Sequence, residues 1–278
     1  MPLMTIPIGI DPVLLRLGPL AVRWYGLMYV IGITVALWVV LPYVRKRGID
    51  EGQVWSLFWY AAVAGLVGAR LYYVVQSDLG YYLTNPEHIL ATWEGGMAFY
   101  GAIFAVVPVI AIFCRLRGVN TWALLDGVAL FALLGQSIGR IGNIINGDIV
   151  GYPTDLPWGT VYTNPNALAP QLGVAYQPAA AYELIFGVAA FLALWRLRFY
   201  FKHDGLLFAT YLIVYSVGQF VIFFLRDNAV VALGLKQAQL TAIVVLMVAF
   251  ALVYWLRLRP ATTPSGTLPP SAPRGACS

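Results

Sequence analysis

Long apolar segments recur along this chain and constrain its fold more than any other feature. Several of them run for about 18 or more residues with few charges, which is the length that a helix needs to cross roughly 30 Å of hydrocarbon. Of the 278 residues, 60% are hydrophobic and only 10% are charged, a composition that excludes a soluble domain of this length. We therefore predict an all-α integral membrane protein that crosses the bilayer several times.

The apolar segments predict about seven transmembrane helices. Their expected ranges are 22–43, 54–75, 97–114, 122–142, 179–197, 205–225 and 240–258. Residues 1–259 form a single polytopic membrane domain in this interpretation, and no internal repeat indicates a repeat-built transporter. Residues 260–278 are rich in Pro, Ser and Thr and are predicted to be a disordered cytoplasmic tail.

Basic residues follow alternate predicted helices and indicate how the chain is oriented. They come after the first, third, fifth and seventh helices: Arg45, Lys46, Arg47, Arg115, Arg117, Arg196, Arg198, Lys202, Arg257 and Arg259. Because cytoplasmic loops carry an excess of Lys and Arg, this pattern puts the N-terminus outside and the C-terminus in the cytoplasm. The longest external loop, 147–178, is rich in Pro, Gly, Asn and Tyr and predicts a small ordered head without a helix.

A cluster of polar residues stands at the predicted outer end of the fourth helix. Arg140, Asn143 and Asn146 are spaced by three residues and so lie near one stripe of the helix, and Asp148 follows them. A charge within the bilayer is expensive unless it is paired or functional, and a guanidinium has the fork geometry that binds a phosphate. Carboxamides also join helices by hydrogen bonds, so helix packing is the alternative interpretation of the two asparagines.

Four other ionisable residues fall within the predicted helices or at their ends. Arg70 lies among small residues and belongs either to a packing ion pair with Glu183 or to a substrate contact. Asp126 lies near the cytoplasmic end of the fourth helix, which favours a structural role. Arg226 ends the sixth helix, and its position favours snorkelling of the guanidinium into the outer interface.

Metal and nucleic-acid binding find no support in the sequence. The only cysteines and histidines are Cys114, Cys277, His88 and His203, and they have no metal-ligand spacing. The net charge of +5 is explained by the basic cytoplasmic loops, so nucleic acid is not an expected partner.

Five motifs carry a resemblance to a known family. Residues 139–151 (GRIGNIINGDIVG) and 153–159 (PTDLPWG) resemble the signature of the bacterial prolipoprotein diacylglyceryl transferases. In the same order along the chain, 22–29 (VRWYGLMY), 93–101 (WEGGMAFYG) and 177–183 (QPAAAYE) resemble other motifs of that family. The resemblance covers roughly residues 8–258, and the motif in the fourth helix is long and specific.

The resemblance implies a transferase in the bacterial plasma (inner) membrane. Members of the family transfer the diacylglyceryl group of phosphatidylglycerol to the lipobox cysteine thiol of prolipoprotein signal peptides, the first step of lipoprotein maturation. The products are a thioether and glycerol phosphate, and no metal or diffusible cofactor is needed. The implied partners are therefore membrane lipid, phosphatidylglycerol and the precursor peptide.

Several residues of this sequence match positions that the family emphasises. Arg140 and Asn143 match its main polar pair, and Asn146 belongs to the same motif. Asp148 stands where the family often has glutamate. Tyr25 matches a tyrosine of the first helix, and Gly151 matches a glycine of the motif.

The sequence departs from the family pattern at three positions. Tyr100 stands where many members have histidine, and Gln219 stands where many have a second arginine. Phe223 stands where they have a nearby glutamate, so the charge pair of the sixth helix is missing as a unit. This loss motivates one alternative, a catalytically weakened or inactive lipid-binding homologue. A small-anion transporter is a second alternative, although it requires a polar stripe through the whole membrane.

These residues suggest how the roles are divided. We expect Arg140 to bind the phosphate and Asn143 and Asn146 to orient glycerol or phosphate oxygens. The thiol must lose a proton because the thiolate is the nucleophile. Tyr100, ionised beside Arg140, is one candidate base, and Asp148 or Glu183 acting through water is the other. The expected substrate-binding residues beyond these are Tyr25, Asn146, Gly151, Glu183 and Gln219, with Arg226 as a partial substitute for the missing arginine.

Overall fold

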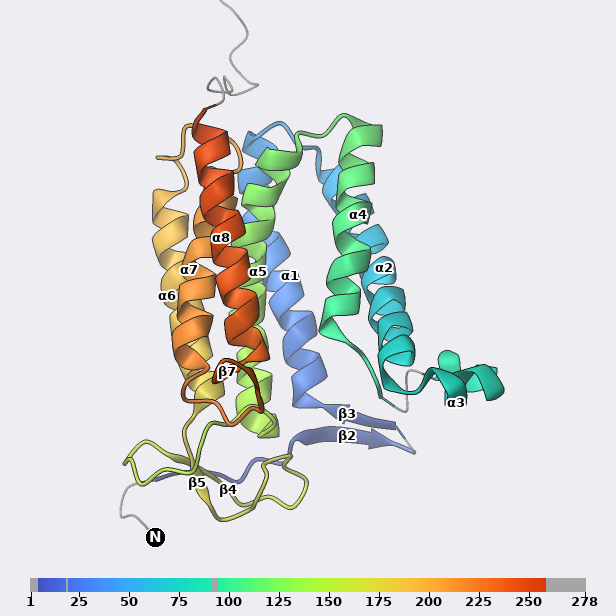
Figure 1. Ribbon diagram of the computed structural model, residues 1–278, viewed down its shortest axis with the longest axis vertical. Coiled ribbons are helices and arrows are strands. Elements are labelled where there is room, and N and C mark those ends of the chain that lie inside the picture. The colour runs from blue at the N-terminus through green and yellow to red at the C-terminus, as the bar shows by residue number, and fades with distance from the viewer. Residues whose placement is uncertain (1–4, 19, 92–94, 259–278) are drawn as a thin grey trace, which may run out of the picture. The chain divides into compact units, whose positions relative to one another are not determined.

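The computed structural model describes residues 5–18, 20–91 and 95–258, and seven long helices lie within them. They are α1 (Trp24–Lys46), α2 (Glu51–Ser77), α4 (Phe99–Arg117), α5 (Thr121–Asn146), α6 (Ala179–Leu197), α7 (Leu206–Ile222) and α8 (Gln237–Arg257) (Figure 1). Six of them are long and apolar enough to cross a membrane, and α7 is a shorter apolar helix of 17 residues. The predicted membrane fold of about seven helices is confirmed. The predicted tail at 260–278 and the start of the 93–101 motif lie outside the described residues.

Short strands supplement the helices. A three-stranded sheet is formed by β1 (Ile6–Ile8), β4 (Thr160–Tyr162) and β5 (Ala175–Tyr176), with β1 parallel to β4. Two hairpins are formed by β2 (Val13–Leu17) with β3 (Leu20–Arg23) and by β6 (Val230–Ala232) with β7 (Leu235–Lys236). The remaining elements are the short helices α3 (Leu79–Thr84) and η1 (Pro86–Ile89).

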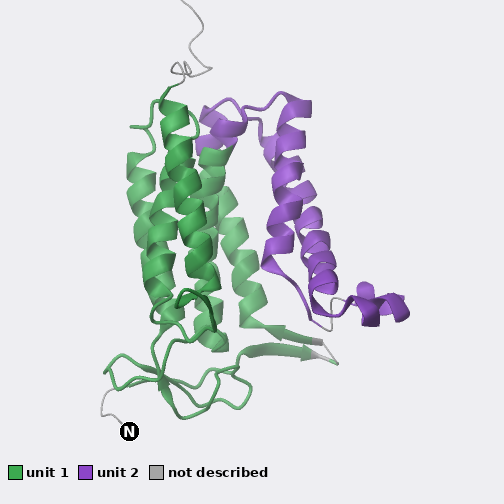
Figure 2. Cartoon of the chain, in the orientation of Figure 1, with its two compact units in different colours: residues 1–42, 125–263 green, residues 43–124, 264–278 purple. Residues whose placement is uncertain are grey.

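The chain divides into two compact units (Figure 2). Among the described residues, unit 1 comprises 5–18, 20–42 and 125–258, and unit 2 comprises 43–91 and 95–124. In unit 1 the strands lie at one end of the helices (Figure 2). We call residues 147–178 the head; it contains β4 and β5 and has a small apolar core of Val150, Tyr162 and Tyr176, to which β1 adds Ile8.

Glycines bring α1 against α5 within unit 1. A Cβ atom on Gly32 would lie 2.6 Å from the carbonyl oxygen of Gly135, and one on Gly142 would lie 2.8 Å from Cα of Tyr25. Neither position has room for a side chain, so the two helices approach backbone to backbone. The approach fixes Tyr25 beside the α5 segment that carries the polar motif.

Arg70 has a structural role in unit 2. Its side chain is buried and donates hydrogen bonds to backbone carbonyls of the segment after α2: His88 at 2.6 Å, Ile89 at 2.9 Å, Gly95 at 2.5 Å and Gly96 at 2.9 Å. A guanidinium has five N–H donors, so these four carbonyls satisfy most of them. The sequence suggested a pair with Glu183 instead, but Glu183 is neutralised by two other arginines, described below.

Asp126 caps the start of α7. Its buried carboxylate accepts the backbone N–H of Gly205 at 3.0 Å and that of Phe208 at 2.9 Å. The first N–H groups of a helix have no partner within it, and a carboxylate also suits the positive end of the helix dipole. The predicted structural role of Asp126 is confirmed.

Candidate functional site

Arg140 forms a buried ion pair between α5 and α6. Its Nη2 atom lies 2.5 Å from Oε2 of Glu183, and the two side chains are 12% and 2% exposed. Its Nη1 atom donates to Oδ1 of Asn143 at 3.2 Å, one turn further along α5. The structure thus brings together Arg140, Asn143 and Glu183, all of which the sequence singled out.

A second arginine shares the same carboxylate. Nη1 of Arg226 lies 3.1 Å from Oε1 of Glu183, and the Arg226 side chain is only 15% exposed. The predicted snorkelling of Arg226 is therefore wrong: its guanidinium is largely buried because Glu183 supplies a counter-charge inside unit 1. Burial holds the pKa of Arg226 below its ordinary value, and the nearby Glu183 only partly offsets this effect. An arginine nevertheless remains charged at neutral pH.

The three side chains form what we call the arginine–glutamate cluster: Arg140, Glu183 and Arg226. It contains two cations and one anion, so it carries one positive charge that no member balances. The Nε atoms of both arginines are buried and donate no hydrogen bond among the described residues. A buried donor without an acceptor costs about 1–3 kcal/mol, more when it is charged. Surplus charge and free donors together indicate a place for an anionic ligand.

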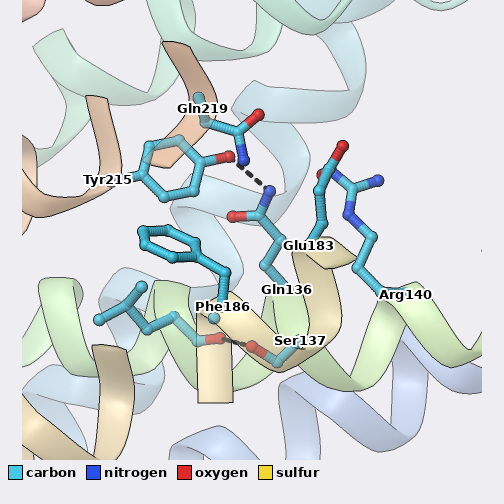
Figure 3. A pocket seen from close by; sticks show the side chains of 9 residues that line it. Gln136, Ser137, Arg140, Glu183, Phe186, Tyr215 and Gln219 are labelled. Carbon is cyan, nitrogen blue, oxygen red and sulfur yellow. Dashed lines mark hydrogen bonds and ion pairs between the residues drawn. The ribbon is translucent and has the colours of Figure 1, made fainter. Parts of the chain in front are cut away.

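A small cavity adjoins the cluster (Figure 3). Its volume is about 10 Å³, close to the space that one water molecule needs. Gln136, Tyr215 and Gln219 line it beside Arg140 and Glu183, and Nε2 of Gln136 donates to the Tyr215 hydroxyl at 2.6 Å. The cavity is too small for a lipid phosphate, so a phosphate can enter it only if the side chains that line it move.

Gln136 and Tyr215, whose side chains are joined by a hydrogen bond in the cavity wall, were not found from the sequence, although a signal for them existed. Gln136 lies one helical turn before Arg140, and Tyr215 lies one turn before Gln219. Residues four apart share a helix face, so extending each predicted stripe by one turn would have found both. Figure 3 shows their side chains pointing toward each other.

Asn143 links Arg140 to the head. Its buried amide donates to both carboxylate oxygens of Asp148, at 3.0 and 3.2 Å, while its carbonyl accepts from Arg140. Gly147 makes the intervening turn with a φ of +77°, a conformation that favours glycine. Asp148 itself is exposed. The arrangement offers a solvated carboxylate that is oriented by a residue bonded to Arg140.

Asn146 has different neighbours. Its Oδ1 atom accepts from Nη1 of Arg23 at 3.0 Å, and its backbone carbonyl accepts the N–H of Leu168 at 2.8 Å. It therefore joins β3 to the head at the end of α5. Sequence reasoning missed Arg23 as a partner, since only the fold brings this residue to α5.

The head is anchored beside the same asparagines by Tyr162. Its hydroxyl donates to the carbonyl of Ile144 at 2.9 Å. Burial raises the pKa of Tyr162 to about 12, so the hydroxyl keeps its proton at neutral pH. The bond holds the head against the last turn of α5.

Gly151 lies where the head meets the segment after α7. It forms an antiparallel bridge with Arg226, and its N–H donates to the carbonyl of Gln177 at 2.9 Å. A Cβ atom there would lie 2.6 Å from that of Gln177 and would also collide with the Leu225 carbonyl. The glycine allows the head to approach the backbone of Arg226.

Tyr25 and Tyr100 occupy different units. Tyr25, near the start of α1, is 37% exposed, and its ring centroid lies 4.8 Å from that of Tyr29. Tyr100 is the second residue of α4 in unit 2 and is half-buried. Their roles as a substrate-binding residue and as a base stay predictions.

Comparison with known proteins identifies relatives over most of the chain. A sequence model described as prolipoprotein diacylglyceryl transferase matches residues 12–255. A protein of Cupriavidus metallidurans is 35% identical over 257 residues, covering 88% of this chain and 93% of the relative. One from Solidesulfovibrio magneticus is 38% identical over 78% of this chain and 81% of its own length, and one from Staphylococcus aureus is 33% identical over 94% and 95%.

All three relatives carry the name phosphatidylglycerol–prolipoprotein diacylglyceryl transferase. The matched range includes all three residues of the arginine–glutamate cluster, and it extends through α7 into the last turn of α8. The chain belongs to the prolipoprotein diacylglyceryl transferase family.

Proposed function

We propose that the protein transfers the diacylglyceryl group of phosphatidylglycerol to the lipobox cysteine of prolipoprotein signal peptides in the bacterial plasma membrane. Family membership and the names of the relatives support this activity. The observation that carries it is the arginine–glutamate cluster, whose surplus positive charge and free Nε–H groups suit the lipid phosphate. With the N-terminus outside, the cluster and the head belong to the outer half of the membrane.

The bond changes balance without a further reactant. The cysteine thiolate attacks the glyceryl carbon that bears the phosphate oxygen, so a C–S bond forms and a C–O bond breaks. Glycerol phosphate leaves with the electron pair of the broken bond, and the thiol proton passes to a base. The developing negative charge falls on the phosphate, where guanidinium groups stabilise it.

Arg140 is the primary phosphate ligand in this proposal. When the phosphate enters, it replaces part of the contact between Arg140 and Glu183 and takes up the free Nε–H groups of Arg140 and Arg226. Glu183 then keeps Arg140 and Arg226 in place when the site is empty. Asn143 orients the bound oxygens through its bond to Arg140, and the amide of Gln219 contributes from the cavity wall.

The remaining predicted ligands contact α5 or the segment that carries Arg226. Tyr25 packs against α5 at Gly142, and Asn146 fixes the end of the same helix. Gly151 contributes indirectly, because its missing side chain lets the head reach the Arg226 backbone. We assign these residues to shaping the substrate site.

Tyr100 and Asp148 are the candidate bases that we retain. Glu183 is not retained as a base because its two carboxylate oxygens already contact guanidiniums, at 2.5 and 3.1 Å. Asp148 is exposed and oriented by Asn143, which suits proton transfer through water.

Tyr100→Phe distinguishes the two bases. The variant keeps the ring and removes only the hydroxyl, so it should lower kcat by about 10²-fold or more if the tyrosine takes the proton. Rates of thioether formation with the purified variant give this value, and Tyr60→Phe is a matched control in α2. If the Tyr100→Phe protein keeps full activity, Tyr100 is not the base and Asp148 remains as the candidate.

The test of the function is transfer by the purified protein. It is reconstituted with phosphatidylglycerol and a lipobox peptide, and the peptide is analysed by mass spectrometry for the diacylglyceryl thioether. We expect this product together with an equal amount of glycerol phosphate, and none with a peptide in which the cysteine is replaced by serine. A protein that binds the lipid but forms no thioether would instead be the inactive homologue that Gln219 and Phe223 suggest.

A further inference from the structure

Lys236 is a buried cation outside the residues considered so far. It is the last residue of β7, directly before α8, and only 5% of it is exposed. Among the described residues, no carboxylate forms an ion pair with it. A buried ammonium is expensive unless its donors are satisfied and its charge has a use.

The donors of Lys236 hold the segment that leads to Arg226. Its Nζ atom donates to the carbonyl of Phe223 at 2.7 Å and to the carbonyl of Arg226 itself. The ammonium also lies 4.7 Å from the ring centroid of Tyr152, a cation–π contact. The backbone N–H of Tyr152 donates to the carbonyl of Leu225 at 3.1 Å. Lys236 therefore contacts this segment directly and also contacts Tyr152, which is itself bonded to the segment.

The position of these carbonyls explains why a lysine suits the site. Phe223 follows the last residue of α7, where carbonyls have no partner within the helix and the dipole favours a cation. The Arg226 carbonyl belongs to the same residue whose side chain contacts Glu183 at 3.1 Å. Fixing that carbonyl fixes the starting point of the Arg226 guanidinium.

We propose that Lys236 is a positioning residue that holds Arg226 in the arginine–glutamate cluster and so sets the affinity for the phosphate of the lipid substrate. The inference rests on the proposed function. It adds a residue that acts through Arg226 without touching the substrate. Its positive charge also adds to the surplus at this end of unit 1, since no carboxylate pairs with it.

The test is a double-mutant cycle on the lipid dependence of transfer. Lys236→Met, Arg226→Met and the double variant are assayed over a range of phosphatidylglycerol fractions in mixed micelles. We expect Lys236→Met to raise KM for the lipid by about tenfold with kcat within about twofold of the wild type. In the Arg226→Met background the same change should alter KM by no more than about twofold, because its target is gone.

A control at the other end of α7 separates positioning from stability. Asp126→Ala removes the cap at Gly205 and Phe208, so it should lower the thermal midpoint while KM stays unchanged. If Lys236→Met behaves in the same way, with lower stability and normal KM, Lys236 only supports the helix end and the proposal is wrong. If Lys236→Met does not accumulate in the membrane, Lys236→Gln replaces it in the cycle.

The outcomes also separate this inference from the proposed function. A wild-type protein that forms no thioether contradicts the function. If the wild type is active but the two substitutions multiply their effects on KM, only the role of Lys236 is contradicted. Independent effects would mean that Lys236 does not act through Arg226.

Discussion

Arg140→Ala is expected to abolish diacylglyceryl transfer, with a loss of at least about 10³-fold in kcat/KM. The change removes the guanidinium that contacts both Glu183 and Asn143. The phosphate would then lose its main ligand in the ground state and in the transition state. Thioether formation by the purified variant measures the loss, and the amount of protein in the membrane fraction checks that insertion is unaffected.

Arg45→Ala is the matched control for this variant. Arg45 also pairs with a glutamate, Glu51, at 3.3 Å, but its side chain is 61% exposed. We expect normal transfer from it, since exposed pairs contribute little to stability and Arg45 lies in unit 2, outside the cluster. Transfer by Arg140→Ala at the rate of Arg45→Ala would refute the role of Arg140.

Glu183→Gln should destabilise the protein more than any other single neutralisation in unit 1. The glutamine keeps the shape of the side chain but leaves Arg140 and Arg226 buried without a counter-charge. Removing one member of a buried ion pair lowers the free energy of unfolding by about 3–5 kcal/mol. Thermal unfolding in detergent measures the effect as a lower midpoint.

Phosphatidylglycerol should restore part of the lost stability in Glu183→Gln. Its phosphate would supply the missing negative charge, and a ligand that binds only the folded state raises the midpoint. The rise should exceed that of the wild type and should be absent with the uncharged lipid diacylglycerol. Glu51→Gln, at the exposed pair, should change stability by about 1 kcal/mol or less. An equal response of Glu183→Gln to both lipids would mean that the phosphate does not contact the cluster.

The helices could be predicted from the sequence because membrane helices are specified locally. A long apolar window is enough to identify one, and α6 begins and ends at the predicted residues 179 and 197. The three-stranded sheet was not predicted, because its strand β1 depends on a distant partner. β1 pairs with β4 through Ile6 and Thr160, and nothing near either residue in the sequence indicates the other.

In the site too, contacts within one helix could be predicted from the sequence, whereas contacts between elements could not. Arg140 and Asn143 are three residues apart on one helix, so their contact follows from helix geometry. Glu183 lies 43 residues before Arg226 in a different element, and the sequence suggested Arg70 as its partner. Which of several buried arginines meets a carboxylate depends on how helices pack. The role of Lys236 was missed for the same reason, since its bonds to Phe223 and Arg226 cross between elements.

Direct binding of phosphatidylglycerol tests the central claim, that Arg140 holds the phosphate of the lipid. The affinity is measured by titrating detergent-solubilised wild type, Arg140→Ala and Arg45→Ala with the lipid, without peptide, so that binding is separated from chemistry. We predict that Arg140→Ala binds at least about 100-fold more weakly than the wild type, which is about 2.7 kcal/mol, while Arg45→Ala is unchanged. Equal affinity of the wild type and a folded Arg140→Ala protein would contradict the account.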